Sequence, residues 1–143
     1  MSTEENKVLV RRYYEECNAI KGDPAKVHAM VDEFFAPDFV AHAPVSGDMN
    51  FEETKQNRAN LFTALPDLNW IVDDMIAEGD KVVTRVAARG THKGEYQGIA
   101  ATGRQVMVPG VDIYRITGGK FIELWACLDT LGLMQQLGVI PSR

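Results

Sequence analysis

The sequence of 143 residues contains only two cysteines, Cys17 and Cys127, and three histidines. Two distant cysteines do not form a disulfide framework, and scattered histidines do not have the spacing of a metal site. No apolar run is long enough to cross a bilayer, and the polar start MSTEENKVLVRR is neither a signal peptide nor a transit peptide. We therefore expect a cytoplasmic protein that binds no metal and does not contact a membrane.

The sequence also lacks an excess of positive charge. The net charge is −5, and acidic and basic residues are mixed along the chain without a charged tail. Nucleic acid and anionic membrane surfaces are therefore poor candidates for a partner. There are no repeats, and the glycine-containing stretch 90–103 opens no helix that would bind a phosphate. A hydrophobic share of 45% in a chain of this length indicates one globular domain over residues 1–143.

The first half of the chain has helical periodicity. Apolar residues recur at helical spacing over residues 3–21. Asp23, followed by Pro24, is typical of the start of a second helix, and Asn50 of the start of a third over residues 51–65. The stretch 36–48, which holds two prolines and a glycine, is expected to be a loop.

After Pro66 the period changes to two. The pattern predicts two strands over residues 68–92 and a hairpin formed by residues 106–116 and 121–128. It also predicts a short closing helix after Asp129. Residues 93–105 are rich in glycine and small side chains and should form a connection. Three helices followed by such strands indicate an α+β fold, with the helices packed on one face of a curved, mostly antiparallel sheet.

Several segments resemble the SnoaL-like polyketide cyclases of the nuclear transport factor 2-like superfamily. Their order and spacing carry the resemblance, which covers almost the whole chain. It implies a cone-shaped half-barrel with an internal pocket for a small hydrophobic molecule. The matching segments are FFAPDFV, GDKVV, RGTHKGEYQGIAATGRQV, YRITGGKFIE and LGLMQQLG.

The resemblance also implies a chemistry. SnoaL-like cyclases close a polyketide ring by an intramolecular aldol reaction without a metal or cofactor. An aspartate on the last strand takes and returns the proton, while a histidine on the neighbouring strand and an asparagine after the second helix help to bind the substrate. In this sequence those positions fall on Ala126, Asp112 and Ala41, so none of the three residue types is kept.

The register of the last hairpin decides how Asp112 and Ala126 are related. A two-residue turn at Gly118 and Gly119 would place Asp112 opposite Trp125, whereas a three-residue loop would place it opposite Ala126. We favour the three-residue loop, because it aligns both family positions across one strand pair. The carboxylate would then have moved from one strand to its neighbour.

Asp112 is therefore the candidate general base, with His92 as a second catalytic candidate. A carboxylate on a concave apolar face would have a raised pKa, which suits a base. The alternatives are that Asp112 lies at the sheet edge or bonds to nearby backbone, that His92 lies at the rim, and that His42 faces solvent. The residues expected to contact the substrate are Tyr114, His42, Ala126, Leu124 and Leu128.

Three functions are open on this basis. The first is a cofactor-free cyclase or isomerase that transfers a proton on a hydrophobic carbonyl compound. The second is a ligand-binding module of the same fold that has no catalytic activity. The third is an epoxide hydrolase, which needs two carboxylates around an arginine inside the pocket. Only Asp112 is a good internal carboxylate, and Arg85 and Arg89 are expected to face outward.

The opposite face of the sheet is expected to be apolar. Alternation along the strands places Val83, Ala87, Val111, Ile113, Trp125 and Cys127 there, together with the two arginines. An apolar patch of that size is rarely left exposed. We therefore expect a homodimer that forms through this convex face.

Overall fold

The computed structural model describes residues 1–141, which form four helices and six strands. The expected α+β class is confirmed. The helices are α1 (Thr3–Asn18), α2 (Pro24–Phe34), α3 (Phe51–Ala64) and α4 (Thr130–Leu137). The strands are β1 (Phe35–Ala43), β2 (Gly47–Asn50), β3 (Asn69–Glu78), β4 (Lys81–Thr91), β5 (Gln105–Thr117) and β6 (Lys120–Leu128).

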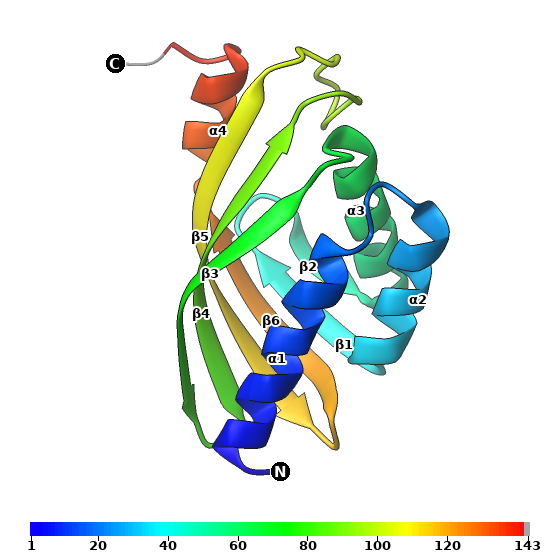
Figure 1. Cartoon of the computed structure of the whole chain (residues 1–143), viewed down its shortest axis with the longest axis vertical. Helices are drawn as coiled ribbons and strands as arrows, with labels where there is room; N and C mark the ends of the chain where they lie inside the picture. Colours follow the sequence, from blue (N-terminus) through cyan, green and yellow to red (C-terminus); the bar gives the residue numbers. More distant parts are fainter. Residues whose placement is uncertain (142–143) are drawn as a thin grey trace.

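The strands form one curved sheet in the order β2-β1-β6-β5-β4-β3. Every neighbouring pair is antiparallel except β1 and β6, which run parallel. Figure 1 shows α1, α2 and α3 on one side of this sheet and α4 at one end of it. Because the sheet curves without closing, the helices and the concave face enclose the interior between them, which is the expected half-barrel.

Polar side chains begin three of the helices, as the sequence predicts. Asp23 accepts a hydrogen bond from the Ala25 amide at the start of α2, and Asp129 accepts one from the Gly132 amide at the start of α4. Asn50 and Glu53 exchange hydrogen bonds at the start of α3. These bonds satisfy amide groups that have no partner within the helix. The predicted helix starts are therefore confirmed.

The expectation of a loop over residues 36–48 was wrong. Most of this stretch forms β1 and β2, which add two strands to the sheet beside β6. Pro37 is tolerated because the pairing of β1 with β6 is irregular between Phe35 and Val40, where a proline removes no ladder bond. The prolines and the glycine led to the wrong prediction, although Phe39 and Ala41 alternate as a strand would.

The β5–β6 hairpin has the turn of one register considered above and the pairing of Asp112 of the other. Gly118 and Gly119 form a two-residue turn, both with positive φ angles, so the predicted three-residue loop was wrong. One extra residue, Ile122, then bulges out of β6 and shifts the pairing. Beyond this bulge Asp112 lies opposite Ala126, so the predicted pairing is confirmed although the predicted turn is not.

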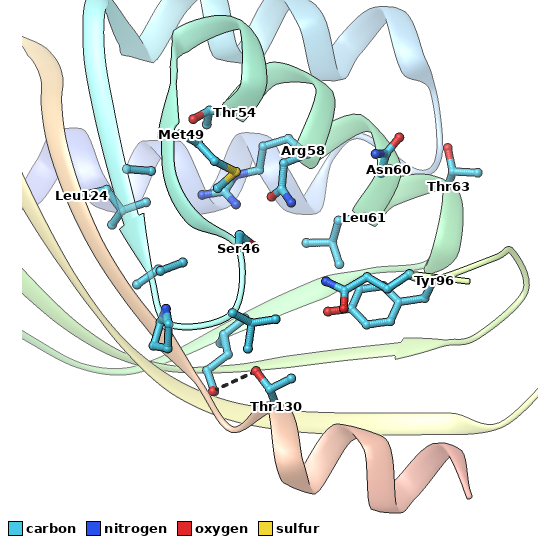
Figure 2. Close-up of a pocket in the computed structure, with 18 of the residues that line it drawn as sticks. Ser46, Met49, Thr54, Arg58, Asn60, Leu61, Thr63, Tyr96, Leu124 and Thr130 are labelled. Atoms are coloured by element: carbon cyan, nitrogen blue, oxygen red, sulfur yellow. Dashed lines mark hydrogen bonds between the residues drawn. The ribbon is translucent and has the colours of Figure 1, made fainter. Parts of the chain in front are cut away.

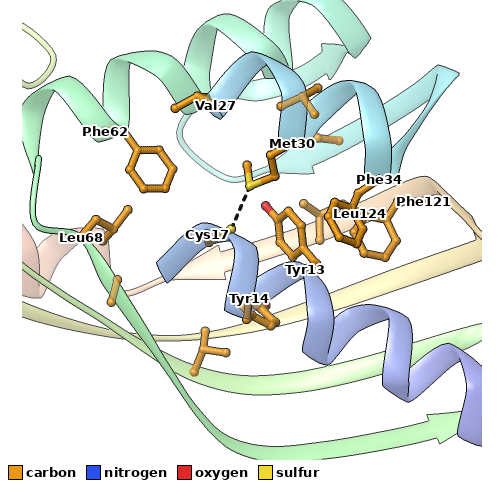
Figure 3. Packing of buried hydrophobic residues seen from close by; sticks show 14 of the residues in the cluster. Tyr13, Tyr14, Cys17, Val27, Met30, Phe34, Phe62, Leu68, Phe121 and Leu124 are labelled. Atoms are coloured by element: carbon orange, nitrogen blue, oxygen red, sulfur yellow. Dashed lines mark hydrogen bonds between the residues drawn. The ribbon is translucent and has the colours of Figure 1, made fainter. Parts of the chain in front are cut away.

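Aromatic rings fill the narrow end of the cone. The ring of Tyr13 packs edge-on against Phe34, Phe35 and Phe121, with ring centres 5.5, 5.6 and 5.2 Å away. Figure 3 shows Tyr13, Phe34 and Phe121 together between the helices and the sheet. Such edge contacts stabilise beyond the apolar area that they bury. This part of the interior is a packed core, and the space for a ligand lies elsewhere.

The convex face carries the residues assigned to it. Arg85 and Arg89 are exposed there, and Val111 is 42% exposed. Arg85 bonds to Asp74 on the neighbouring strand at 2.7 Å. The homodimer through this face stays a prediction. Over residues 1–141, no helix is long and apolar enough to cross a membrane.

We predict that Phe121→Ala lowers the free energy of unfolding by about 3–5 kcal/mol, because the ring is fully buried among other rings and leaves a cavity. Urea denaturation measures the change. Ile76→Ala, at a side chain that is 66% exposed on β3, is the control and should change the value by less than about 0.5 kcal/mol. Equal effects of the two substitutions would contradict the assignment of the core.

Candidate functional site

A cavity of about 500 Å³ lies between α3, the β1–β2 hairpin and the concave face of the sheet. Its deep wall contains the buried residues Ala41, Thr54 and Leu124, whereas Ser46 and Glu95 are exposed at its mouth. The other lining residues are Ala43, Pro44, Val45, Met49, Asn57, Arg58, Asn60, Leu61, Thr63, Trp70, Tyr96, Gln97, Ala126, Leu128 and Thr130.

Helix α3 presents polar side chains to this interior. Thr54, Asn57, Arg58 and Leu61 all line the cavity, and their spacing places them on one face of the helix. Figure 2 shows Thr54, Arg58 and Leu61 on the side of α3 that faces Leu124 and the β1–β2 turn. A helix that packs only against a core would carry apolar residues at these positions. The polar face of α3 is therefore directed at the cavity.

Arg58 is the only basic side chain among the lining residues. Its Nε is buried and has no hydrogen-bond partner among residues 1–141, and none of their carboxylates forms an ion pair with it. Burial by itself lowers the pKa of the guanidinium, but acidic groups around it, among them Tyr13 and Asp112, hold that pKa above its ordinary value. The cavity therefore contains a permanent positive charge.

Thr54 lies one helical turn before Arg58 and is fully buried. Its Oγ1 has no hydrogen-bond partner among the residues of the described chain. Most buried hydroxyl groups in proteins are hydrogen-bonded, because an unpaired buried polar group destabilises the fold. The Thr54 hydroxyl and the Arg58 Nε are thus two neighbouring polar groups on the α3 wall of the cavity that have no hydrogen-bond partner in the described chain.

Asp112 lies on β5 beside the cavity wall. It is 6% exposed, and its Oδ2 accepts a hydrogen bond from the Tyr14 hydroxyl at 2.9 Å. The Tyr14 hydroxyl also contacts Thr84 Oγ1 at 2.9 Å and the Tyr114 hydroxyl at 2.8 Å. This network of four side chains connects α1 to β4 and β5 through the interior.

Burial raises the pKa of the Asp112 carboxyl above its ordinary value, although the Tyr14 hydrogen bond, the Arg58 charge and Tyr114 oppose the shift. Burial also raises the pKa of the Tyr14 and Tyr114 hydroxyls. Both tyrosines therefore remain protonated and can donate. A buried carboxylate with a raised pKa is better suited to accept a proton near neutral pH than an exposed one.

The structure places some of the predicted site residues at the cavity and others behind its wall. Ala126, Leu124 and Leu128 line the cavity. Asp112 and Tyr114 are buried in the network behind it and are not among the lining residues. The Ala126 methyl group, at the position expected for the family's aspartate, is thus what an occupant of the cavity would meet, with Asp112 directly across the strand pair.

His92 is buried at the end of β4 and does not line the cavity. Its Nδ1 accepts a hydrogen bond from the Thr102 amide at 3.2 Å and lies 3.0 Å from Thr102 Oγ1. Because Nδ1 accepts, the proton of the neutral ring lies on Nε2. These bonds connect His92 to the segment between β4 and β5, so the side chain organises that segment and does not face the cavity.

The expectation that His42 contacts substrate is not supported by its position. Its neighbours on β1, Ala41 and Ala43, line the cavity, so alternation directs His42 to the convex face. There its ring lies 2.7 Å from Glu123 and 2.8 Å from Asp48, and these two hydrogen bonds raise the pKa of the imidazole.

Arg58 and Thr54 are the residues that sequence reasoning missed. The signal was present in the segment FEETKQNRANLFTAL, where the positions that share a face with Leu61 hold polar side chains. This pattern alone is equally compatible with a solvent-exposed helix. The conclusion requires the position of α3 over the sheet.

Comparison with known proteins agrees with this architecture. A model of the SnoaL-like polyketide cyclases matches residues 8–137. The chain belongs to the SnoaL-like polyketide cyclase family. No curated protein matches it.

Solved structures show the same fold. AclR, a candidate hydroxylase from Streptomyces galilaeus, is 26% identical, with a TM-score of 0.86 over 99% of this chain and 86% of that one. IdmH, a candidate polyketide cyclase from Streptomyces antibioticus, is 28% identical, with a TM-score of 0.78 over 93% and 98%. TsrD from Streptomyces laurentii is 30% identical, with a TM-score of 0.75 over 93% and 97%. These relationships support a role of the cyclase or isomerase type in general.

The raised pKa of Asp112 predicts how stability depends on pH. The folded chain holds this proton more tightly than the unfolded chain, whose carboxyl has the ordinary pKa of 3.8. Between that value and the raised one, increasing pH lowers the free energy of unfolding. Asp112→Asn removes this loss, so the stability of the variant relative to wild type should rise as pH increases above the ordinary carboxyl pKa of 3.8 and level off beyond the raised pKa.

Urea denaturation at several pH values measures this difference. Asp38→Asn, at an exposed carboxylate on β1, is the control for the loss of one negative charge. A difference between Asp112→Asn and wild type that does not change with pH would show that the carboxyl is not perturbed.

Proposed function

We propose that this member of the SnoaL-like family catalyses proton transfer on a hydrophobic carbonyl compound, with Asp112 as the general base. One observation carries the proposal: a buried carboxylate with a raised pKa lies directly across the strand pair from Ala126, which lines the cavity. The reaction class comes from the family, and the chemistry needs no group beyond these side chains.

The proposed reaction begins with transfer of an α-proton from the substrate to the Asp112 carboxylate, which leaves an enolate. The enolate carbon then attacks a second carbonyl of the same molecule, a carbon–carbon bond forms, and the resulting alkoxide takes the proton back. In an isomerase the proton returns to a different atom of the same enolate. Atoms and charge balance in both cases, and no oxidant or reductant is consumed.

The short side chain of Ala126 is important in this proposal. Side chains directly opposite each other in an antiparallel pair have Cβ atoms about 4.5–5.5 Å apart. A ligand that rests on the Ala126 methyl group therefore lies next to the strand that carries Asp112. The Tyr14 hydroxyl donates a hydrogen bond to Asp112 Oδ2, which holds Asp112 in one orientation and stabilises its charged form.

A second candidate, a ligand-binding module without catalysis, is favoured by a different observation. Asp112 is not among the lining residues, and Tyr14 and Tyr114 already occupy its Oδ2. An epoxide hydrolase is less well supported. An arginine, Arg58, does lie inside, but the one carboxylate that lines the cavity is Glu95, which is exposed at the mouth.

Hydrogen–deuterium exchange tests the proposal without knowledge of the natural substrate. The probes are 2-tetralone and a tricyclic ketone, and mass spectrometry follows the uptake of deuterium next to the carbonyl. We expect the wild-type protein to accelerate exchange above the buffer rate. Asp112→Asn should slow the protein-dependent exchange by about 10²- to 10⁴-fold, the usual contribution of a general base.

A rescue variant separates a catalytic role from a structural one. Ala126→Asp, combined with Asp112→Asn, returns a carboxylate to the cavity wall, and we expect it to recover part of the lost exchange. Normal exchange in Asp112→Asn would show that another group is the base. If no ketone exchanges faster than in buffer, the protein is better described as a binding module.

A further inference from the structure

The deep wall of the cavity carries a positive charge that the protein leaves without an ion-pair partner. Three other arginines form ion pairs with nearby carboxylates on the outside of the molecule: Arg12, Arg85 and Arg115. Arg58 forms none with residues 1–141, although its side chain is half-buried and its Nε is fully buried. Tyr13 and Asp112 stabilise the Arg58 cation through space, but no carboxylate of the described chain forms an ion pair with it, so the guanidinium is available to an anionic ligand.

Two donors point in the same direction from one helix. Arg58 follows Thr54 by four residues, which places both side chains on the same face of α3. The Thr54 hydroxyl and the Arg58 Nε are both buried, both without a partner in the described chain, and both belong to lining residues of the cavity. Figure 2 shows the Arg58 side chain extending from α3 into the space beside Met49 and Leu124.

The surroundings limit what such a pair of donors can bind. A guanidinium group presents parallel N–H donors that match the two oxygens of a carboxylate. A phosphate, with more charge and more oxygens, normally needs several donors, and no other basic residue lines this cavity. The neighbouring wall is apolar, with Ala41, Leu124 and Ala126. A single carboxylate on an apolar body fits both features.

We propose that Arg58 and Thr54 form a carboxylate-binding subsite and that the natural ligand is a hydrophobic keto acid with a free carboxyl group. Arg58 would bind the carboxylate through two N–H groups. The Thr54 hydroxyl, which is fully buried and has no partner in the described chain, would donate to one of the carboxylate oxygens once a bound ligand displaces the side chains that cover it. The apolar body of the ligand would then extend along Leu124 and Ala126 toward the mouth. The identity of the ligand as a carbonyl compound rests on the proposed function, whereas the carboxylate recognition rests on the geometry of α3.

Equilibrium binding tests this subsite without any turnover. The probes are benzoate, 2-naphthoate and anthracene-2-carboxylate, each paired with its methyl ester, and isothermal titration calorimetry measures the dissociation constants. We expect at least one acid to bind about 10- to 100-fold more tightly than its ester, the range for a buried charge-assisted hydrogen bond. High salt should weaken this preference only slightly, because buried charges are screened less than exposed ones.

Three variants assign the preference to particular side chains. Arg58→Met should abolish the preference for the acid while leaving ester binding within about threefold, since it keeps the apolar stem. Thr54→Val, which replaces the hydroxyl by a methyl group, should reduce the preference by about three- to tenfold. Arg89→Met, at an exposed arginine on the convex face, is the matched control and should leave both affinities unchanged.

Folding of the variants is measured separately by circular dichroism and urea denaturation. Arg58→Met should fold, because the substitution breaks no ion pair, and Asp112 can respond to the loss of the positive charge by taking up a proton. If Arg58→Met does not fold, Thr54→Val still tests the subsite, because it preserves the shape of the side chain.

Equal binding of acid and ester in the wild-type protein, or a preference that survives in Arg58→Met, would overturn the subsite. So would the absence of binding by all three acids. Exchange of ketone protons without any preference for acids would refute the carboxylate subsite and leave the proposed function intact. A preference for acids without exchange would support the subsite and contradict the catalytic proposal.

Discussion

The Tyr14 hydroxyl is the contact on which the organisation of the interior depends. It lies within hydrogen-bond distance of Thr84 on β4 and of Asp112 and Tyr114 on β5. These bonds connect α1 to the concave face of the sheet. The same contact orients the Asp112 carboxylate, which is buried behind the cavity wall. Structure and proposed chemistry therefore share a single hydroxyl group.

The sequence was a good guide wherever local physical chemistry determines the structure. Asp23, Asn50 and Asp129 begin helices because their side chains satisfy free amides, and this depends only on a few neighbouring residues. The pairing of Asp112 with Ala126 was predicted, but for the wrong reason: a bulge at Ile122 compensates a tight glycine turn. A bulge has no reliable local signal, so the register could be inferred only from the family positions.

Prediction from the sequence was poorest where contacts between distant parts of the chain determine the local structure. Residues 36–48 contain turn-forming residues, yet β1 is a strand because β6 provides it with a parallel partner more than eighty positions later in the chain. Arg58 was missed for a related reason. Its position on α3 is typical of a solvated helix face until the sheet encloses it. Periodicity indicates which residues share a face, but it does not indicate what that face meets.

The proposed function distributes the chemistry of the cavity wall over two strands. Ala126, at the position where the resemblance places the family's acid, lies opposite Asp112 on the neighbouring strand. The Asp112 carboxyl lies behind the wall, where burial raises its pKa and Tyr14 holds it. The small Ala126 side chain leaves room for a ligand, and Arg58 is the charged residue on the deep part of the cavity wall. With the base behind the wall and the cation within it, an occupant would be oriented by its own negative charge before its carbonyl approached Asp112. In these two proposals, recognition and proton transfer are assigned to different elements, α3 and β5, so that a substitution on one element can change its role without changing the other.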